Sequence, residues 1–442
     1  MNAATDHPLF SDPQHLSTVE SLVLKQVRLL NPVTGLDQVG DLWVQQGRVK
    51  ATGTLPPELP SHTCQLSGEG WVVGPGLVDL YAHGSEPGFE HRETRTELTL
   101  TAMQGGFTRV ALLPSTVPAL DSITGLAALQ KQLPPEGPAY LPLAAVTLQA
   151  AGHQLSDLGD LSSSAIVGFC QDQPLQSYAQ LRHLMEYLQG LAKPLLLWAW
   201  DPQLAQSGVL FEGSTTLHLG LAGIPTLAET TVVATLLEFL HRTPIPLHLM
   251  RISQPRSLDL IRQAQSAGLP LSASTTWLHL LFSVEAIQQS GYDPYLRLTP
   301  PLVEETARQH LIQGVRDRVL AIATDHQAYT FEEKAVPFGE APSGAPGLAL
   351  ALPLLWDQLV RTGALSPLQL WAALSSLPAL NLQQLPGQLS PEQPADLVVL
   401  DPEHNWTPPA HPGRSALLTL LYPDQKQRGK ILGYWSSHPP SS

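Results

Sequence analysis

The sequence predicts an α/β protein: a (β/α)8 barrel with a small discontinuous β domain built from both ends of the chain. The middle of the 442-residue chain alternates short apolar segments with longer helical stretches, such as 175–191 and 257–267. Eight parallel βα units are typical of this barrel, in which functional residues lie at the C-terminal ends of the strands. The eight apolar segments end near His83, Pro114, Leu148, Cys170, Ala199, Met250, Ser274 and Thr324.

Short alternating segments at both chain ends predict the β domain. Residues 20–73 contain several of them, separated by turn residues such as Asn31-Pro32 and Gln46-Gly47. A second cluster, at 395–401 and 430–435, lies near the C-terminus. We therefore predict three parts, which are a flexible tail at 1–18, a composite β domain at 19–73 plus 385–442, and the barrel at 74–384.

Composition narrows the class of protein. Hydrophobic residues make up 43% of the chain and charged residues 14%, which indicates a globular protein. A formal net charge of −14 disfavours a nucleic-acid partner, which would require a basic face. The two cysteines, Cys64 and Cys170, are too few for a disulfide framework and suit a reducing compartment. No apolar stretch reaches membrane-spanning length, so we predict a soluble, cytoplasmic protein without a membrane partner.

The first predicted barrel strand ends in Tyr81-Ala82-His83. A strand ending in His-x-His would place two imidazoles on one face, because side chains two apart share a side of the pleat. Such a pair can begin a catalytic zinc site that later strands complete. Here the first position is a tyrosine, a poor zinc ligand, and the other strand ends decide whether a metal site remains.

Several motifs carry a family resemblance. They are Gly74–His91, Gly105-Gly106-Phe107-Thr108, Gly223-Ile224-Pro225, Thr299-Pro300-Pro301-Leu302, Ile322–His326, Glu332-Glu333-Lys334, Val336-Pro337-Phe338, Gly347-Leu348 and Pro394–Val398. In these runs the chain resembles the long-chain (class I) dihydroorotases of the amidohydrolase superfamily. Those are zinc hydrolases that interconvert carbamoyl-aspartate and dihydroorotate in pyrimidine biosynthesis. The resemblance covers almost the whole chain beyond the N-terminal tail and implies the amidohydrolase form of the barrel.

The resemblance also implies metal ligands that this sequence mostly lacks. Where it implies His-x-His at the first strand, the chain has Tyr81 and His83. Where it implies an acidic ligand after the fourth strand, the chain reads Cys170-Gln171-Asp172, with Gln171 as a loss and Asp172 as the possible remnant.

The later strand ends depart further. The histidines implied after the fifth and sixth strands fall on Trp198 and Arg251, and only the final aspartate, Asp325, is unchanged. A guanidinium stays protonated in proteins, so Arg251 puts a cation where a neutral ligand would face zinc. We expect Arg251 to pair with Asp325 or Asp172 and to fill the space of the metal, with no metal bound.

The positions that the resemblance assigns to substrate contacts are altered as well. An implied arginine is Ser85, two implied asparagines are Ser115 and Thr299, and an implied histidine is Tyr329. We regard these four residues as remnants of a substrate pocket.

Four further residues near the strand ends each have a separate interpretation. Trp198 and Trp200 either fill volume or stack on a planar ligand. His248 precedes Arg251 by three residues and is predicted to point to the other side of the strand. His279 lies where the resemblance expects a histidine, in a structural role.

Three functional hypotheses follow. In the first, the chain is an inactive dihydroorotase homologue that serves as a structural or regulatory partner; the resemblance implies aspartate carbamoyltransferase as that partner, with self-association as the other option. In the second, it is an active dihydroorotase-type cyclic amide hydrolase, with zinc on His83, Asp172 and Asp325 and with Asp325 as general base. In the third, it is a pyrimidine-intermediate binding module, in which Arg251 holds a carboxylate.

Overall fold

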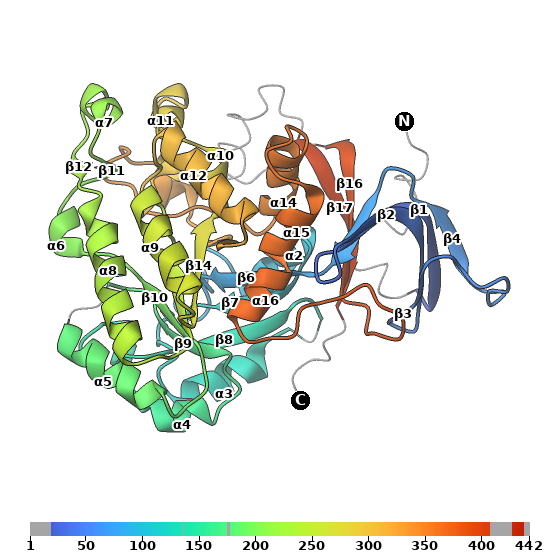
Figure 1. The fold of residues 1–442 in the computed structure, drawn as a ribbon, viewed down its shortest axis with the longest axis horizontal. Coiled ribbons are helices and arrows are strands. Elements are labelled where there is room, and N and C mark those ends of the chain that lie inside the picture. The colour runs from blue at the N-terminus through green and yellow to red at the C-terminus, as the bar shows by residue number, and fades with distance from the viewer. Residues whose placement is uncertain (1–18, 135, 175–176, 407–426, 437–442) are drawn as a thin grey trace.

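The computed structural model describes residues 19–436, except 135, 175–176 and 407–426. An eight-stranded sheet forms the centre, helices surround it, and a second sheet stands beside it (Figure 1). The predicted barrel with a β domain from both chain ends is confirmed. The predicted tail at 1–18 lies outside the described residues, and the three domain limits remain predictions.

The barrel strands are parallel and follow the order β15-β14-β13-β10-β9-β8-β7-β6. Most end close to the positions expected from sequence. The predicted number of eight barrel strands is confirmed. The third strand, however, ends at Ala145, and residues Leu148–Ala150 form a single 3-10 turn. The strands are β6 (Leu77–Ala82), β7 (Phe107–Leu112), β8 (Ala139–Ala145), β9 (Gly168–Gln171), β10 (Leu195–Trp198), β13 (Leu247–Met250), β14 (Leu271–Thr276) and β15 (Leu320–Ala323).

The first and last strands of the barrel, β6 and β15, are fastened to each other near their C-terminal ends. The backbone N–H of His83 donates to the carbonyl of His326 over 2.9 Å. Nearby, the fully buried carboxyl group of Asp79 accepts hydrogen bonds from the backbone N–H of Thr324 at 2.8 Å and from its hydroxyl at 2.5 Å. These contacts hold the ends of β6 and β15 in register, which fixes the spacing of the residues that follow them.

Asp79 is expected to make stability depend on pH. Burial raises the pKa of Asp79 from 3.8 to about 7. The folded protein therefore keeps the proton up to about pH 7, whereas the unfolded chain releases it near pH 3.8. Stability contributed by the neutral carboxyl is fully present below about pH 3.8 and is lost as the pH rises through about 7.

The matched variant is Asp79→Asn, whose amide can bond Thr324 without titrating. Between about pH 4 and pH 8, the free energy of unfolding of the wild type should fall relative to this variant by roughly 2–4 kcal/mol. Urea unfolding at a series of pH values measures the difference. Two parallel stability curves would contradict the buried, titrating carboxyl.

The helices around the barrel begin at conventional caps. Thr94 and Ser366 each form a capping box with the residue three positions on, and Asp201 accepts from two backbone N–H groups of α6. The helices are α2 (Arg95–Gln104), α3 (Ile123–Gln132), α4 (Leu158–Ser162), α5 (Tyr178–Leu188), α6 (Pro202–Ala205), α7 (Ser214–Leu219), α8 (Leu227–Arg242), α9 (Pro255–Ser266), α10 (Trp277–Leu281), α11 (Glu285–Gln289), α12 (Glu305–Arg316), α13 (Phe331–Lys334), α14 (Ala351–Leu355), α15 (Pro367–Leu374) and α16 (Ser376–Asn381).

The second sheet combines both ends of the chain. Its order is β17-β16-β5-β1-β2-β3, with β4 also paired to β1. β1 runs through Gln26, a residue with a φ of 57°, and its pairing with β2 shifts register there. The strands are β1 (Ser21–Asn31), β2 (Leu36–Gln45), β3 (Arg48–Gly53), β4 (Cys64–Ser67), β5 (Val72–Pro75), β16 (Leu397–Trp406) and β17 (Gln427–Trp435), and a separate ribbon pairs β11 (Leu210–Phe211) with β12 (Gly223–Ile224).

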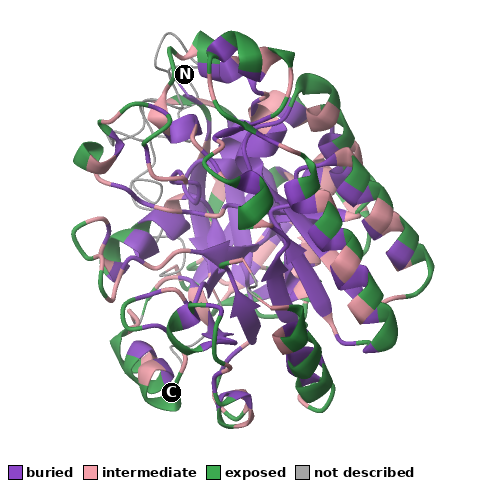
Figure 2. Cartoon of the chain, turned by 90° about the vertical axis from the view of Figure 1, so that its left-hand side faces the viewer, coloured by how far each residue is buried: buried purple, intermediate pink, exposed green. Residues whose placement is uncertain are grey.

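Two hydrophobic cores support these layers. The larger core joins the barrel strands to the helices around them, and Figure 2 shows the buried strands enclosed by helices with exposed outer faces. The smaller core lies within the second sheet. The cores meet where Trp371 donates from its indole N–H to the carbonyl of Pro75 over 2.8 Å. Gly74 is required there, because a Cβ at this position would lie 2.3 Å from the Trp371 ring. Across the described ranges, no helix is long and apolar enough to cross a membrane.

Candidate functional site at the barrel mouth

Residues from distant parts of the chain converge at the C-terminal ends of the barrel strands. His83 follows β6, Asp172 follows β9, Trp198 ends β10, Arg251 follows β13 and Asp325 follows β15. Parallel strands in a barrel bring these positions to one rim. Arg251 is the centre of the site. It contacts the side chains of His83, Trp198 and Asp325 and the backbone of Asp172.

Arg251 forms a bidentate ion pair with Asp325. Its Nε and Nη2 atoms donate to the two carboxylate oxygens over 2.8 and 2.7 Å. Both residues have left-handed backbone conformations, with φ values of 58° and 47°. Such backbone conformations are uncommon for residues other than glycine, and here they occur immediately after the two strands. The pair is one of the two expected from sequence.

The ion pair sets the protonation of both partners. Burial alone would raise the pKa of the Asp325 carboxyl, but the Arg251 guanidinium outweighs burial and holds that pKa below its ordinary value. Burial would likewise lower the pKa of Arg251, and the Asp325 carboxylate outweighs it and raises that pKa. Both groups therefore stay charged at neutral pH, and Asp325 is a weak base.

His83 lies against this ion pair. Its Nε2 is 3.4 Å from Nη2 of Arg251 and 3.7 Å from a carboxylate oxygen of Asp325. Because a guanidinium can only donate, Nε2 of His83 is the acceptor and its proton sits on Nδ1. Burial lowers the pKa of His83, although the Asp325 carboxylate opposes the shift. The imidazole is therefore neutral, and its Nε2 lone pair is directed to Arg251.

Asp172 also borders the site. One carboxylate oxygen accepts from the hydroxyl of Ser115 over 2.5 Å, while the other is buried without a hydrogen-bond partner among the described residues. The contact between Asp172 and Arg251 runs through the backbone, since Nη1 of Arg251 donates to the Asp172 carbonyl over 3.4 Å. Of the two acidic partners considered for Arg251, Asp325 is the one bound by its side chain.

Tyr81 closes the floor of the site with a buried hydrogen-bond network. Its hydroxyl accepts from the backbone N–H of Arg251 over 3.1 Å and lies 2.9 Å from the hydroxyl of Ser274. Ser274 in turn bonds Nε2 of His248, and Ser272 bonds Nδ1. Burial lowers the pKa of His248 to about 3, so the imidazole is neutral.

This network corrects the prediction for His248. The strands β6 and β14 are not neighbours, so the bond from Tyr81 to Ser274 crosses the barrel interior. His248 shares that bond network and therefore points inward, beneath Arg251 and not away from it. The prediction was wrong because it extended regular strand geometry to Arg251, whose left-handed backbone breaks the alternation.

Gln171 and the two indoles lie at the ends of β9 and β10. Gln171 is fully buried, accepts from the Thr147 hydroxyl over 2.8 Å and donates to the carbonyl of Ala150. Trp198 and Trp200 stack with ring centroids 5.6 Å apart and planes at 12°. Arg251 lies over the Trp198 ring, 5.1 Å from its centroid. The indole N–H of Trp198 is buried without a partner among the described residues.

The other three substrate-pocket remnants have structural partners. The Tyr329 hydroxyl donates to the Ser343 carbonyl over 3.0 Å, and its ring packs on the guanidinium of Arg92. Thr299 accepts from Arg297 over 3.2 Å, and the buried Ser85 accepts at its carbonyl in the turn that follows β6.

His279 has both ring nitrogens engaged, by the Thr276 hydroxyl at 2.7 Å and the Pro301 carbonyl at 3.0 Å. Burial lowers its pKa to about 4. Three structural residues near the site were missed in the sequence. Asp79 accepts from the backbone N–H of Thr324, and the buried Glu93 and His326 pair over 3.0 Å. An aspartate within the otherwise apolar strand before Tyr81 was the available signal for the first.

The donor set does not fit zinc. The described ranges contain no group of three or more His, Cys, Asp or Glu side chains placed to hold a metal ion. The two residues closest to such a role, His83 and Asp325, both direct their donor atoms to Arg251. A catalytic zinc needs about three protein ligands and an open position, and a permanent cation in that position repels it.

Comparisons with solved structures define the class of fold. The chain superposes on the L-hydantoinase (dihydropyrimidinase) of Arthrobacter aurescens with a TM-score of 0.79, over 94% of this chain and 96% of that one, at 20% identity. The dihydropyrimidinase of Brevibacillus agri gives a TM-score of 0.75 at 16% identity. The fold is therefore that of the amidohydrolase-type barrels.

Sequence relatives define the family. Residues 70–241 match a family model described as dihydro-orotase-like. A dihydroorotase-like protein of Synechocystis sp. is 37% identical over 418 residues, covering 88% of this chain and 93% of that protein. A dihydroorotase-like protein of Pseudomonas aeruginosa is 33% identical, and a dihydroorotase of Syntrophotalea carbinolica is 31% identical over 93% of this chain and 96% of the relative. The chain belongs to the dihydroorotase-like family.

Proposed function

We propose that this chain is a metal-free, catalytically inactive dihydroorotase homologue that acts as a structural or regulatory partner, with aspartate carbamoyltransferase as the leading partner. The observation that carries the proposal is the bidentate ion pair between Arg251 and Asp325 at the barrel mouth. This ion pair engages Asp325, the aspartate that the family resemblance implies after the last strand and that this sequence retains.

The chemistry of hydrolysis supports this reading. Attack on a cyclic amide needs an activated water and a base with a pKa near the working pH. Asp325 is the candidate base, and the guanidinium of Arg251 holds its pKa below the ordinary value. A weak base without an activated nucleophile gives little rate enhancement, so the barrel is retained for what its outer surface binds.

The test combines metal analysis and turnover on the purified full chain. We expect a transition-metal content well below one per chain and no hydrolysis of dihydroorotate above the uncatalysed rate, with an active dihydroorotase assayed in parallel. Adding zinc should change neither result. Stoichiometric metal together with turnover would establish the alternative, a cyclic amide hydrolase with zinc on His83, Asp172 and Asp325.

The partner role needs its own measurement. The chain and aspartate carbamoyltransferase from the same cells should co-elute and co-sediment as one complex when mixed. Separate elution of the two proteins at micromolar concentration would remove the transcarbamoylase as partner and leave the inactive barrel without an assigned function.

Two buried polar atoms favour a second candidate, a module that binds a pyrimidine intermediate. Among the described residues, one oxygen of Asp172 lacks a donor and the indole N–H of Trp198 lacks an acceptor, and both residues lie beside Arg251. A ligand with neighbouring amide N–H and carbonyl groups would satisfy both. Dihydroorotate or carbamoyl-aspartate at saturating concentration would then raise the melting temperature, and no shift with either would dismiss this candidate.

A further inference from the structure

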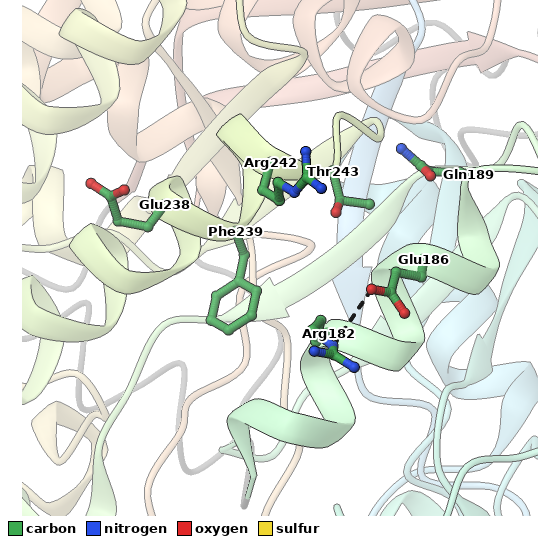
Figure 3. A pocket seen from close by; sticks show the side chains of 7 residues that line it. All are labelled: Arg182, Glu186, Gln189, Glu238, Phe239, Arg242 and Thr243. Atoms are coloured by element: carbon green, nitrogen blue, oxygen red, sulfur yellow. Dashed lines mark ion pairs between the residues drawn. The ribbon is translucent and has the colours of Figure 1, made fainter.

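A groove between helices α5 and α8, on the outside of the barrel, takes no part in the proposed site (Figure 3). Two of its charged residues, Arg182 and Glu186, pair with each other along α5 at 3.5 Å. None of its polar lining atoms is buried without a hydrogen-bond partner among the described residues. Nothing in the groove therefore identifies an occupant.

The segment that follows the last barrel strand is more informative. Residues 327–345 begin two positions after Asp325, include the short helix α13, and form a closed loop at the barrel rim. At the base of this loop, the backbone N–H of Gln327 donates to the carbonyl of Ala345 over 3.0 Å. We call residues 327–345 the strap.

Two consecutive side chains fasten the strap to two different neighbours. Glu333 forms an ion pair with Arg92, which follows β6, at 2.5 Å. Nζ of Lys334 donates to the carbonyl of Pro294, outside the strap, over 3.0 Å, and to that of Pro342, within it, over 2.6 Å. The side chains of the ion pair keep 20% and 26% of their exposure, whereas Lys334 keeps 2%. Lys334 is therefore the buried fastening.

The surroundings of Lys334 suit an uncharged amine. The carbonyls of Pro294 and Pro342 accept the two N–H bonds that such an amine has, and Nζ has no third acceptor among the described residues. The rings of Tyr295 and Tyr329 lie 5.3 and 5.0 Å from Nζ and offset only part of the hydration that a buried ammonium loses. The charged form of Lys334 is therefore costly while the strap is closed.

The charges near Lys334 do not remove this cost. Burial lowers the pKa of Lys334 from 10.5 to about 7. The Arg297 guanidinium adds to this shift, and the carboxylates of Asp293 and Glu333 oppose it. Within the described part of the chain neither carboxylate pairs with Lys334, since Glu333 binds Arg92 and Asp293 accepts from a backbone N–H. The charged and titratable groups around Lys334 are Glu333 and Tyr329 of the strap, Asp293, Tyr295 and Arg297 of the neighbouring segment, and Arg92.

We propose that the strap opens as a unit at the barrel rim and that protonation of Lys334 favours the open state. An open strap places the ammonium group in water, whereas the closed strap buries it between two carbonyls and two rings. A proton therefore binds more tightly to the open strap, and binding it shifts the population towards that state. This inference goes beyond the proposed function, because it holds whether or not the barrel mouth is catalytic.

The pH window follows from the two states of Lys334. The pKa of Lys334 is about 7 in the closed strap and returns to 10.5 when the side chain is in water. Between these values the open strap carries a proton that the closed strap lacks, so opening becomes about tenfold less favourable for each unit of rising pH. Below about pH 7 both states carry the proton, and opening no longer depends on it. Because Asp79 titrates at about 7, a range above about pH 8 isolates Lys334.

Hydrogen–deuterium exchange of the full chain, measured by mass spectrometry on peptides from the strap, tests the proposal. Exchange of an exposed amide accelerates in proportion to hydroxide concentration, whereas opening should decline in the same proportion between about pH 8 and pH 9.5. With reclosing faster than exchange, the wild-type strap should therefore exchange at a nearly constant rate over this range. In Lys334→Met opening does not titrate, so the strap should exchange about tenfold faster with each pH unit.

The matched control is Lys193→Met. Nζ of Lys193 also donates to a backbone carbonyl, that of Ile166, over 2.6 Å, but outside the strap, so the constant exchange rate of the strap should remain. Three results overturn the proposal. They are a wild-type strap whose exchange accelerates with hydroxide, a strap that follows the exchange of α9 at every pH and so opens only with the barrel, and a Lys334→Met strap that keeps the constant rate. The first two need no variant.

Discussion

Replacing Arg251 by methionine is expected to lower the free energy of unfolding by about 3 kcal/mol. The change removes both hydrogen bonds to Asp325 and leaves a carboxylate at the barrel mouth without a cation. Removing one partner of a buried pair costs more than the pair contributes, because the remaining charge is left in a poor environment. Asp325 keeps 20% of its side-chain exposure, so the effect lies at the lower end of the usual range.

The matched control is Arg262→Met. Arg262 makes an equally short contact with Asp317, at 2.6 Å, but the two side chains are 32% and 41% exposed. Exposed pairs of this kind contribute about 0–1 kcal/mol. Urea unfolding of both variants should therefore separate a buried from an exposed pair. The double variant Arg251→Met with Asp325→Asn should recover stability relative to Arg251→Met alone, since it leaves no unpaired charge.

The same pair fixes the direction of a pH effect. Because Arg251 holds the pKa of Asp325 below 3.8, the contribution of the pair is present above that pH and is lost as the pH falls through the lowered value. The stability gap between the wild type and Arg251→Met should accordingly narrow in acid. A gap of less than about 0.5 kcal/mol at neutral pH would mean that the pair is not buried in solution.

Both the barrel and the ion pair of Arg251 with Asp325 at its mouth were predictable from the sequence. Alternating strands and helices repeat eight times, and a guanidinium at a strand end needs a carboxylate, of which Asp325 was one of two candidates. The bond between Tyr81 and Ser274 was not predictable, because it crosses the barrel between strands that are far apart in sequence. His248 bonds the same serine from the neighbouring strand β13. Left-handed conformations at Arg251 and Asp325 also leave no signal in residue type.

Tyr81→His alone is expected to leave the chain without stoichiometric zinc. The substitution restores the His-x-His of the first strand, but Arg251 still engages the donor atoms of both His83 and Asp325. Two like unit charges 4 Å apart repel each other by about 4 kcal/mol at an effective dielectric constant of 20, and the zinc ion carries two positive charges. The indole of Trp198 also packs on the guanidinium and holds it in place, 5.1 Å from the ring centroid.

Adding Arg251→His to Tyr81→His should change this result. The double variant has three imidazoles and the Asp325 carboxylate at one rim, a donor set that suits four-coordinate zinc. We expect its zinc affinity to exceed that of Tyr81→His by more than about 100-fold, or roughly 2.7 kcal/mol, measured by titration and by metal content after dialysis. Arg251→His without Tyr81→His is the matched control and should bind more weakly than the double variant.

Stoichiometric zinc in Tyr81→His itself would show that the Arg251 side chain leaves the site when a ligand is supplied. The ion pair with Asp325 would then be weak enough for a metal to displace, and the large stability loss expected for Arg251→Met would have to be small as well. The two experiments therefore constrain each other. Both depend on how firmly one guanidinium is held between a carboxylate, an imidazole and an indole at the mouth of this barrel.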